Sequence, residues 1–201
     1  LAETKFTGLT CGISLSINLS AQTIKDRSIT EFIDRIDVSR LRPACIVFEI
    51  TEASAVEDID DVRHFIDFAH DRGFKIALDN FGTSYSSFHL LKKLDVDFVK
   101  VDGNFISTLR DDPTDQAFIE SLLKIARVRH FGVVAEWVDN RDKHEYLTDL
   151  GIDYMQGFHI HAGYNEMELL AFLSALPPRP SNVRPAKFAA CNKASLLTCG
   201  F

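Results

Sequence analysis

The chain has 201 residues, of which 46% are hydrophobic, so it can bury one sizeable core and is too short for two ordinary domains. Its formal net charge of -7 argues against binding to a DNA or RNA polymer or to an anionic membrane surface, because like charges repel. No apolar run approaches the roughly 20 residues that cross a bilayer, and we expect a cytoplasmic protein.

Short apolar runs alternate with longer amphipathic ones from Cys11 to about Leu176, a pattern typical of parallel strands joined by crossover helices. The runs rich in Ile, Val and Phe predict strands at Ile13–Leu19, Ile46–Ile50, Lys75–Leu78, Phe98–Val101, Val133–Glu136 and Tyr154–Ile160. The runs between them predict helices at Thr30–Ile36, Ile59–Arg72, Ser86–Leu94, Thr114–His130 and Asn140–Leu150, with a last helix at Asn165–Ala175.

The ends of these helices carry residues that favour capping. Thr30, Ser86 and Thr114 stand at three helix starts, where a hydroxyl can accept a hydrogen bond from a free backbone N–H. Gly73 and Gly151 follow two helix ends, where a left-handed residue is commonly needed. The caps therefore support the helix positions that the periodicity predicts.

Six strand and helix units favour a (β/α) barrel, although an open doubly wound sheet would give the same local pattern. A closed barrel of this kind has eight strands and about 250 residues, so we expect a barrel at residues 1–176 that lacks its first strands. The stretch 177–201 changes character, with three prolines in its first four residues, and predicts a C-terminal tail or linker.

Each predicted strand ends, at its carboxyl side, in a polar group that can bind a metal ion or move a proton. In parallel barrels these ends converge on one face, where barrel active sites lie. Carboxylate and amide oxygens suit hard cations such as Mg²⁺ or Mn²⁺, and two such ions can support phosphodiester cleavage. The residues at these ends are Asn18, Glu49, Asp79, Lys100 with Asp102, Glu136 and Gln156.

The segment from Asn80 to Ser87 follows a predicted strand and leads into a helix, so its free amides could face a phosphate. It matches neither a Walker loop nor a dinucleotide-binding fingerprint. Taken alone, these residues predict a barrel enzyme or a ligand-binding protein whose mouth suits divalent metal and phosphate.

Six motifs resemble, in order and spacing, the strand-end motifs of EAL domains. They are Ser16–Ser20, Phe48–Glu52, Leu78–Thr83, Val99–Asp102, Ala135–Glu136 and Met155–Phe158. The resemblance implies an α/β fold, a modified TIM-like (β/α)8 barrel of EAL type that is incomplete at its N-terminus. It also implies hydrolysis of cyclic di-GMP to the linear dinucleotide with two Mg²⁺ or Mn²⁺ ions.

The resemblance also implies roles for individual residues. Lys100 would handle the attacking water as the catalytic base, and Glu136 and Gln156 would belong to the metal and water network. Glu52 would brace the loop from Asn80 to Ser87, and Gly82 and Asp139 would belong to the loop and the groups that surround the site. The implied metal ligands are Asn18, Glu49, Asp79, Asn80 and Asp102.

The chain departs from the family pattern at several positions. The Glu-Ala-Leu motif that names the family is absent, and Asn80 replaces the second aspartate of a bridging pair, which removes a unit charge. Trp137 and Asp139 replace the glycine and the second glutamate of an Ala-Glu-Gly-Val-Glu-like motif. Ser84 replaces a glycine and predicts a more restricted loop, because a non-glycine residue adopts positive φ only at a cost.

The sequence leaves three functions open. The first is a cyclic di-GMP phosphodiesterase domain that is impaired in this form, and the second is a catalytically inactive cyclic di-GMP receptor, which Asn80 favours. The third is a protein-interaction module that no longer binds nucleotide. Six barrel strands leave open sheet edges, so we expect a homodimer. The resemblance further implies a sensor or cyclase domain in the parent protein, which could be attached to a membrane.

Overall fold

The computed structural model describes residues 14–35, 43–84, 87–161, 163, 167–168, 171 and 197–199. These residues form one parallel sheet with helices on its outer side, so the predicted α/β class is confirmed. The predicted helix at Asn165–Ala175 and the stretch 177–201 lie largely outside the described residues. In the part of the chain that is described, no helix is long and apolar enough to span a membrane.

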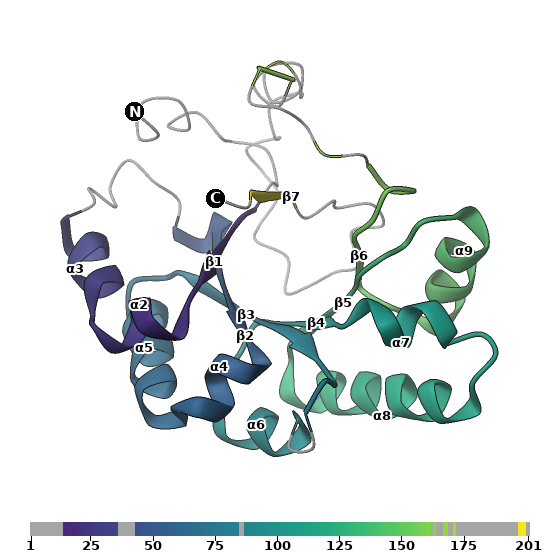
Figure 1. Cartoon of the computed structure of the whole chain (residues 1–201), viewed down its shortest axis with the longest axis horizontal. Coiled ribbons are helices and arrows are strands. Elements are labelled where there is room, and N and C mark those ends of the chain that lie inside the picture. The colour runs from purple at the N-terminus through teal and green to yellow at the C-terminus, as the bar shows by residue number, and fades with distance from the viewer. Residues whose placement is uncertain are drawn as a thin grey trace.

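All strand pairings in the sheet are parallel, and the strands follow the order β6-β5-β4-β3-β2-β1-β7. The bounds are β1 Leu15–Leu19, β2 Ile46–Thr51, β3 Lys75–Phe81, β4 Phe98–Val101, β5 Gly132–Ala135, β6 Tyr154–Met155 and β7 Leu197–Cys199. The strands form an open arc (Figure 1), since no pairing joins β6 to β7 among the described residues. This arc is a segment of the barrel that the sequence predicts.

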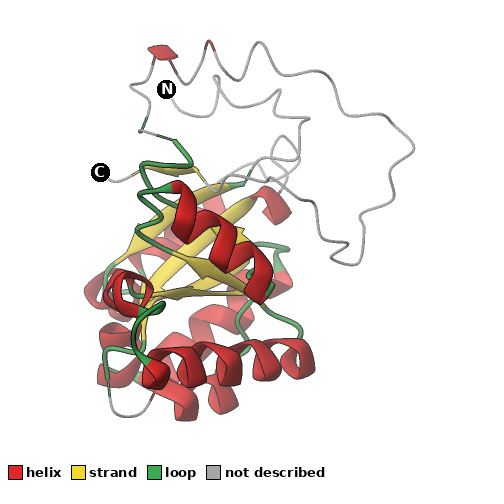
Figure 2. Ribbon diagram, turned by 90° about the vertical axis from the view of Figure 1, so that its right-hand side faces the viewer, coloured by secondary structure: helices red, strands yellow, loops and turns green. Residues whose placement is uncertain are grey.

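Helices join successive strands and cover the outer side of the arc (Figures 1 and 2). The bounds are α2 Ala21–Lys25, α3 Ser28–Arg35, α4 Glu52–Glu57, α5 Ile59–Asp71, α6 Ser87–Lys93, α7 Gly103–Thr108, α8 Pro113–Arg129 and α9 Arg141–Leu150, with a short 3-10 helix, η2, at Pro43–Cys45. The five longer helices agree with the predicted ranges within two residues at each end. Gly73 and Gly151 have the predicted left-handed conformation, with φ of 82° and 80°.

Two predicted caps are wrong, because residues further toward the N-terminus begin these helices. Helix α3 begins at Ser28, and the Thr30 hydroxyl donates to the Arg27 carbonyl oxygen at 2.7 Å. Helix α8 is capped by Asp112, whose carboxylate accepts from the Thr114 amide at 2.7 Å. An aspartate before a proline at the first helical turn is the stronger N-terminal signal here.

The predicted strand Tyr154–Ile160 is wrong beyond Met155. Gly157 has φ of 156°, and its carbonyl oxygen accepts from the amides of Ile160 and His161, both at 3.0 Å. These bonds curl the chain into a turn directly after Gln156. The strand therefore delivers Gln156 to the end of the sheet and stops.

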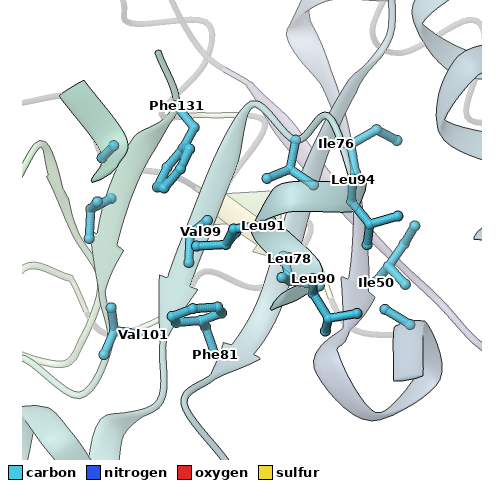
Figure 3. Packing of buried hydrophobic residues seen from close by; sticks show 14 of the residues in the cluster. Ile50, Ile76, Leu78, Phe81, Leu90, Leu91, Leu94, Val99, Val101 and Phe131 are labelled. Carbon is cyan, nitrogen blue, oxygen red and sulfur yellow. The ribbon is translucent and has the colours of Figure 1, made fainter. Parts of the chain in front are cut away.

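The side of the sheet that faces the helices carries the main core. Every second residue of the strands packs outward, and Figure 3 shows the leucines of α6 lying against them. The central residues in this view are Ile50, Ile76, Leu78, Val99 and Val101 of the strands with Leu90, Leu91 and Leu94 of the α6 segment. Full burial of such a side chain stabilises a fold by about 1.5–3 kcal/mol.

The opposite side of the sheet, inside the arc, carries an apolar layer and a polar layer. A smaller cluster there consists of Val47, Ala77, Phe98 and Val134, with Tyr154 packed against it. Side chains two positions apart point to the same face of a strand. The residues two positions after these five are Glu49, Asp79, Lys100, Glu136 and Gln156. The apolar cluster thus lies directly next to the polar layer, on the side toward the amino ends of the strands. The polar layer lies at their carboxyl ends.

Candidate active site at the carboxyl ends of the strands

Lys100 lies at the centre of the polar layer and contacts three carboxylates. Its Nζ is 2.9 Å from Glu49 Oε2, 2.9 Å from Asp79 Oδ1 and 2.9 Å from Glu136 Oε1. Lys100 and Glu49 are only 4% and 1% exposed. Charges so far from water are costly unless they are paired, so the lysine and the carboxylates hold one another in place.

The electrostatics of this cluster keep Lys100 protonated. Burial lowers the pKa of Lys100, but the charges of Glu49, Glu136 and Asp79 outweigh burial, and the pKa is raised overall. Burial also raises the pKa of Glu136, while the neighbouring ammonium opposes this shift. The cluster consequently holds a fixed ammonium together with a carboxyl that binds a proton more readily than an ordinary glutamate.

Strand register brings these side chains together. Asn18 of β1 lies opposite Glu49 of β2, and Asp79 of β3 lies opposite Thr51 of β2. Lys100 is on the next strand, β4, and Glu136 follows the end of β5. Because the strands are parallel, their polar ends meet on one face, as the sequence predicts.

Glu52 anchors the loop that follows β3. It is fully buried, and its Oε2 accepts from the Gly82 amide at 2.9 Å and from the Thr83 amide at 3.0 Å. Its Oε1 accepts from the Ser84 hydroxyl at 2.6 Å. One carboxylate therefore holds three consecutive residues of the loop beside the polar layer. Hydrogen bonds to a charged acceptor are about twice as strong as neutral ones.

Two loop residues explain why this bracing is possible. Gly82 has φ of 105°, and a Cβ there would lie 2.6 Å from the Phe105 ring, so glycine is required. Ser84 does not have positive φ, so the restriction predicted for it is wrong. Sequence reasoning missed its hydrogen bond to Glu52. The serine hydroxyl in the loop that the resemblance assigns to Glu52 is the signal that could have revealed it.

The other predicted residues lie around the cluster in different settings. Asn80 has φ of 55° and is half-buried, and Asn18 is exposed. Asp102 caps α7, where its Oδ1 accepts from the Asn104 amide at 2.9 Å. Asp139 is on the surface, with its carboxylate 3.0 Å from Lys143 Nζ. Gln156 continues the hydrogen bonding of β6, since its amide donates to the Ala135 carbonyl oxygen at 2.8 Å.

The cluster has spare capacity for a cation. Glu49 Oε1 is buried without a hydrogen-bond partner among the described residues. The three carboxylates around the single Lys100 ammonium leave a formal surplus of two negative charges. Within the described ranges, no group of three His, Cys, Asp or Glu side chains forms a ready-made metal cage. The carboxylate oxygens are of the kind that binds a hard divalent ion. In this structure the Lys100 ammonium lies between them, at the centre of the cluster.

The sequence of this chain is similar to those of known proteins. A model of the EAL domain family matches residues 1–162. The cyclic di-GMP phosphodiesterase PdeB of Shewanella oneidensis is 33% identical over 147 residues, which are 73% of this chain and 17% of PdeB. The cyclic di-GMP phosphodiesterase PdeF of Escherichia coli is 36% identical over 115 residues, which are 57% of this chain and 15% of PdeF. The chain thus spans less than a fifth of the length of these two relatives.

The fold also has solved counterparts. The chain is similar to Klebsiella pneumoniae BlrP1 in a complex with manganese and cyclic di-GMP, with a TM-score of 0.69 and 28% sequence identity. The likeness covers 78% of this chain and 41% of the BlrP1 chain.

Proposed function

Because this chain belongs to the EAL domain family, we propose that it is the nucleotide-binding and catalytic part of a cyclic di-GMP phosphodiesterase. The observation that carries the proposal is the buried contact of Lys100 with three carboxylates at the carboxyl ends of parallel strands. The relatives PdeB and PdeF are named as cyclic di-GMP phosphodiesterases, and the BlrP1 structure contains that nucleotide. The product would be the linear dinucleotide.

The residues present fit a divalent metal of the hard class, Mg²⁺ or Mn²⁺. Glu49 has an unused buried oxygen, and Asn18 lies beside it in register. These two and Asp79 would hold one ion, and Asp79 with Asn80 would lie nearest to a second. When bound, such ions stabilise charge on phosphoryl oxygens and lower the pKa of bound water. The manganese in the BlrP1 complex supports this choice of metal.

The side chains of this chain have separate tasks in the proposed reaction. Lys100 holds the carboxylates together and, as an ammonium, presents positive charge to a phosphate oxygen. It can accept a proton only after the surrounding negative charge has been compensated, since that charge is what raises its pKa. Glu136 holds or releases a proton beside it. Glu52 keeps the loop after β3 in position.

A second candidate function is a cyclic di-GMP receptor without turnover, and Asn80 favours it. This residue brings a neutral amide to a position next to Asp79, where a carboxylate would add negative charge. A weaker site for a second cation would leave nucleotide binding in place and slow hydrolysis. The two candidates share the ligand and differ only in the chemical step.

Calorimetric titration of cyclic di-GMP in the presence of Ca²⁺, followed by a product assay with Mg²⁺ or Mn²⁺, tests the proposal. Binding with formation of linear dinucleotide is expected, and binding without product would establish the receptor. Glu49→Gln, which removes one charge at nearly constant size, should abolish turnover and weaken binding. Glu31→Gln on the exposed side of α3 is its matched control. Absence of binding by the unchanged chain would refute both candidates.

We also propose a setting for this domain. Since the chain covers less than a fifth of relatives such as PdeB, we assign it to a longer cytoplasmic or membrane-attached protein that carries a sensor or cyclase domain. In that setting, the sensor would regulate the site described above.

A further inference from the structure

Trp137 exposes an aromatic ring at the edge of the candidate active site. It directly follows Glu136, whose carboxylate contacts Lys100, and it is 56% exposed. Most large apolar side chains of the described core are nearly inaccessible to water. Trp137 is, like Phe158, one of the exposed large apolar residues, and it is its place directly after Glu136 of the buried polar cluster that suits its flat ring to contact with a bound ligand.

The backbone holds Trp137 in a conformation that bulky residues rarely adopt. Its φ is 54°, in the left-handed region. The next residue, Val138, is fully buried, and its amide donates to the Gln156 carbonyl oxygen at 3.0 Å. The His159 amide donates back to the Val138 carbonyl oxygen at 3.0 Å. These two hydrogen bonds fix the backbone directly after Trp137, and backbone strain of this kind persists mainly at functional sites.

The indole ring of Trp137 packs directly against Gly103. A Cβ on Gly103 would lie 2.1 Å from Trp137 Cδ2 and 2.6 Å from Cε2, so only glycine leaves room for the ring. Gly103 follows Asp102 at the end of β4, and Trp137 follows the end of β5. The ring is therefore held between two strand ends at the same face as the Lys100 cluster, with more than half of the residue still open to solvent.

On the basis of the proposed function, we propose that Trp137 is a stacking platform for a guanine base of the bound cyclic dinucleotide. The Lys100 cluster would receive the phosphate, and a base linked to that phosphate must lie a short way outside the cluster. An indole that is already fixed in place loses little conformational entropy when a base stacks on it. Stacking on an aromatic ring tolerates any base, because every base has a flat π-face, so a guanine of the dinucleotide qualifies.

The chain contains a single tryptophan, so its intrinsic tryptophan fluorescence reports on Trp137 alone. Titration of cyclic di-GMP with Ca²⁺ should change this emission with the same midpoint as the heat of binding. Saturating inorganic phosphate, which has no base, should leave the emission unchanged. An equal change with phosphate would assign the signal to charge near Glu136 and would overturn the stacking proposal.

Substitutions separate the ring from the fold. Trp137→Gly removes the side chain and tolerates the positive φ, and it should weaken binding of cyclic di-GMP about 5- to 150-fold. Trp137→Phe should restore most of the affinity. Phe32→Ala is the matched control, since Phe32 is 60% exposed on α3. Unchanged affinity of the glycine variant would refute the stacking platform and leave the proposed function intact. No heat of binding with the unchanged chain would refute the proposed function and the platform with it.

Discussion

At the scale of single residues, Lys100 balances the charge of the site. Lys100→Met removes the ammonium and leaves the buried Glu49, Asp79 and Glu136 facing one another. Without divalent cations we expect the free energy of unfolding to fall by about 3–5 kcal/mol, the usual cost of removing one partner from a buried ion pair. Urea unfolding measures the loss, and added Mn²⁺ should stabilise the variant more than the unchanged chain.

The control for this prediction is Lys93→Met on the exposed surface of α6, which should change the unfolding free energy by less than about 0.5 kcal/mol. If Lys100→Met were as stable as this control in the absence of metal, the charge balance described above would be wrong.

Asn80 limits the charge available next to Asp79. Asn80→Asp should raise metal-dependent turnover of cyclic di-GMP by about tenfold or more, because a carboxylate binds a second hard cation better than an amide does. The backbone should be unaffected, since asparagine and aspartate both tolerate the observed φ of 55°. The turnover rate with Mn²⁺ checks this, with melting temperature as the test of an intact fold. A slower or unchanged rate would count against a charge deficit at this position.

At the scale of elements, Glu52 at the start of α4 joins β2 to the loop after β3. Glu52→Gln keeps the size but removes the charged acceptor of the Gly82 and Thr83 amides, and its amide nitrogen cannot accept from the Ser84 hydroxyl. We expect the free energy of unfolding to fall by about 2–4 kcal/mol. Hydrogen exchange at residues 82–84 should rise in the same variant. Exchange that is unchanged at these residues would show that other contacts hold the loop.

Much of the element pattern could be predicted from the sequence, and length decides where prediction fails. Strands β1 to β5 stand out as runs rich in Ile, Val and Phe, and the longer helices persist long enough for a period of 3.6 residues to show. Helices α2, α4 and α7 have five or six residues and show no period, so they were missed. Their caps were visible, however: Ser20 and Asp102 directly follow a strand and Thr51 ends one, and each accepts from an amide of the next turn.

The sequence predicts which residues form the candidate site, but it does not predict which of them contact one another. Glu49, Asp79 and Glu136 stand at strand ends that any parallel barrel brings to one face. That Lys100 reaches all three together depends on the register of β2 to β5 and on the bulge between Leu78 and Phe81, which no local pattern encodes. The raised pKa of Lys100 follows from those contacts, so it was equally hidden.

At the scale of the whole molecule, a charged network at the opposite end of the strands ties the helix layer to the sheet. Asp97 Oδ2 accepts from the Ile76 amide at 2.9 Å and lies 2.9 Å from His70 Nε2 of α5, and Lys75 lies 2.5 Å from its other oxygen. The hydrogen bond with Asp97 raises the pKa of His70. Burial would raise the pKa of Asp97, but bonds from His70, Lys75 and Ile76 outweigh it and lower this pKa.

These shifts give the stability of the fold a defined pH dependence. A raised histidine pKa stabilises the fold below about pH 6.5, the ordinary histidine value, and this contribution is lost as pH rises through the folded-state pKa. We expect the free energy of unfolding to fall by about 1 kcal/mol between pH 6 and pH 8. His70→Gln should remove this slope in urea unfolding, whereas His89→Gln, on the exposed side of α6, should keep it. An equal slope in both variants would contradict the assignment to His70.

The open sheet predicts self-association of this chain. Among the described strands β6 is an edge, so its outward backbone groups are unpaired within the sheet and can pair with a second chain. The Gln156 amide donates to Ala135 and Met155 lies opposite Ala135, so the Met155 amide points away from β5 toward the open edge. We expect a dimer in light scattering at micromolar concentration, and Met155→Pro should weaken it about tenfold, because proline lacks the amide hydrogen without disturbing the bonds to β5. A strictly monomeric chain in light scattering would contradict this prediction.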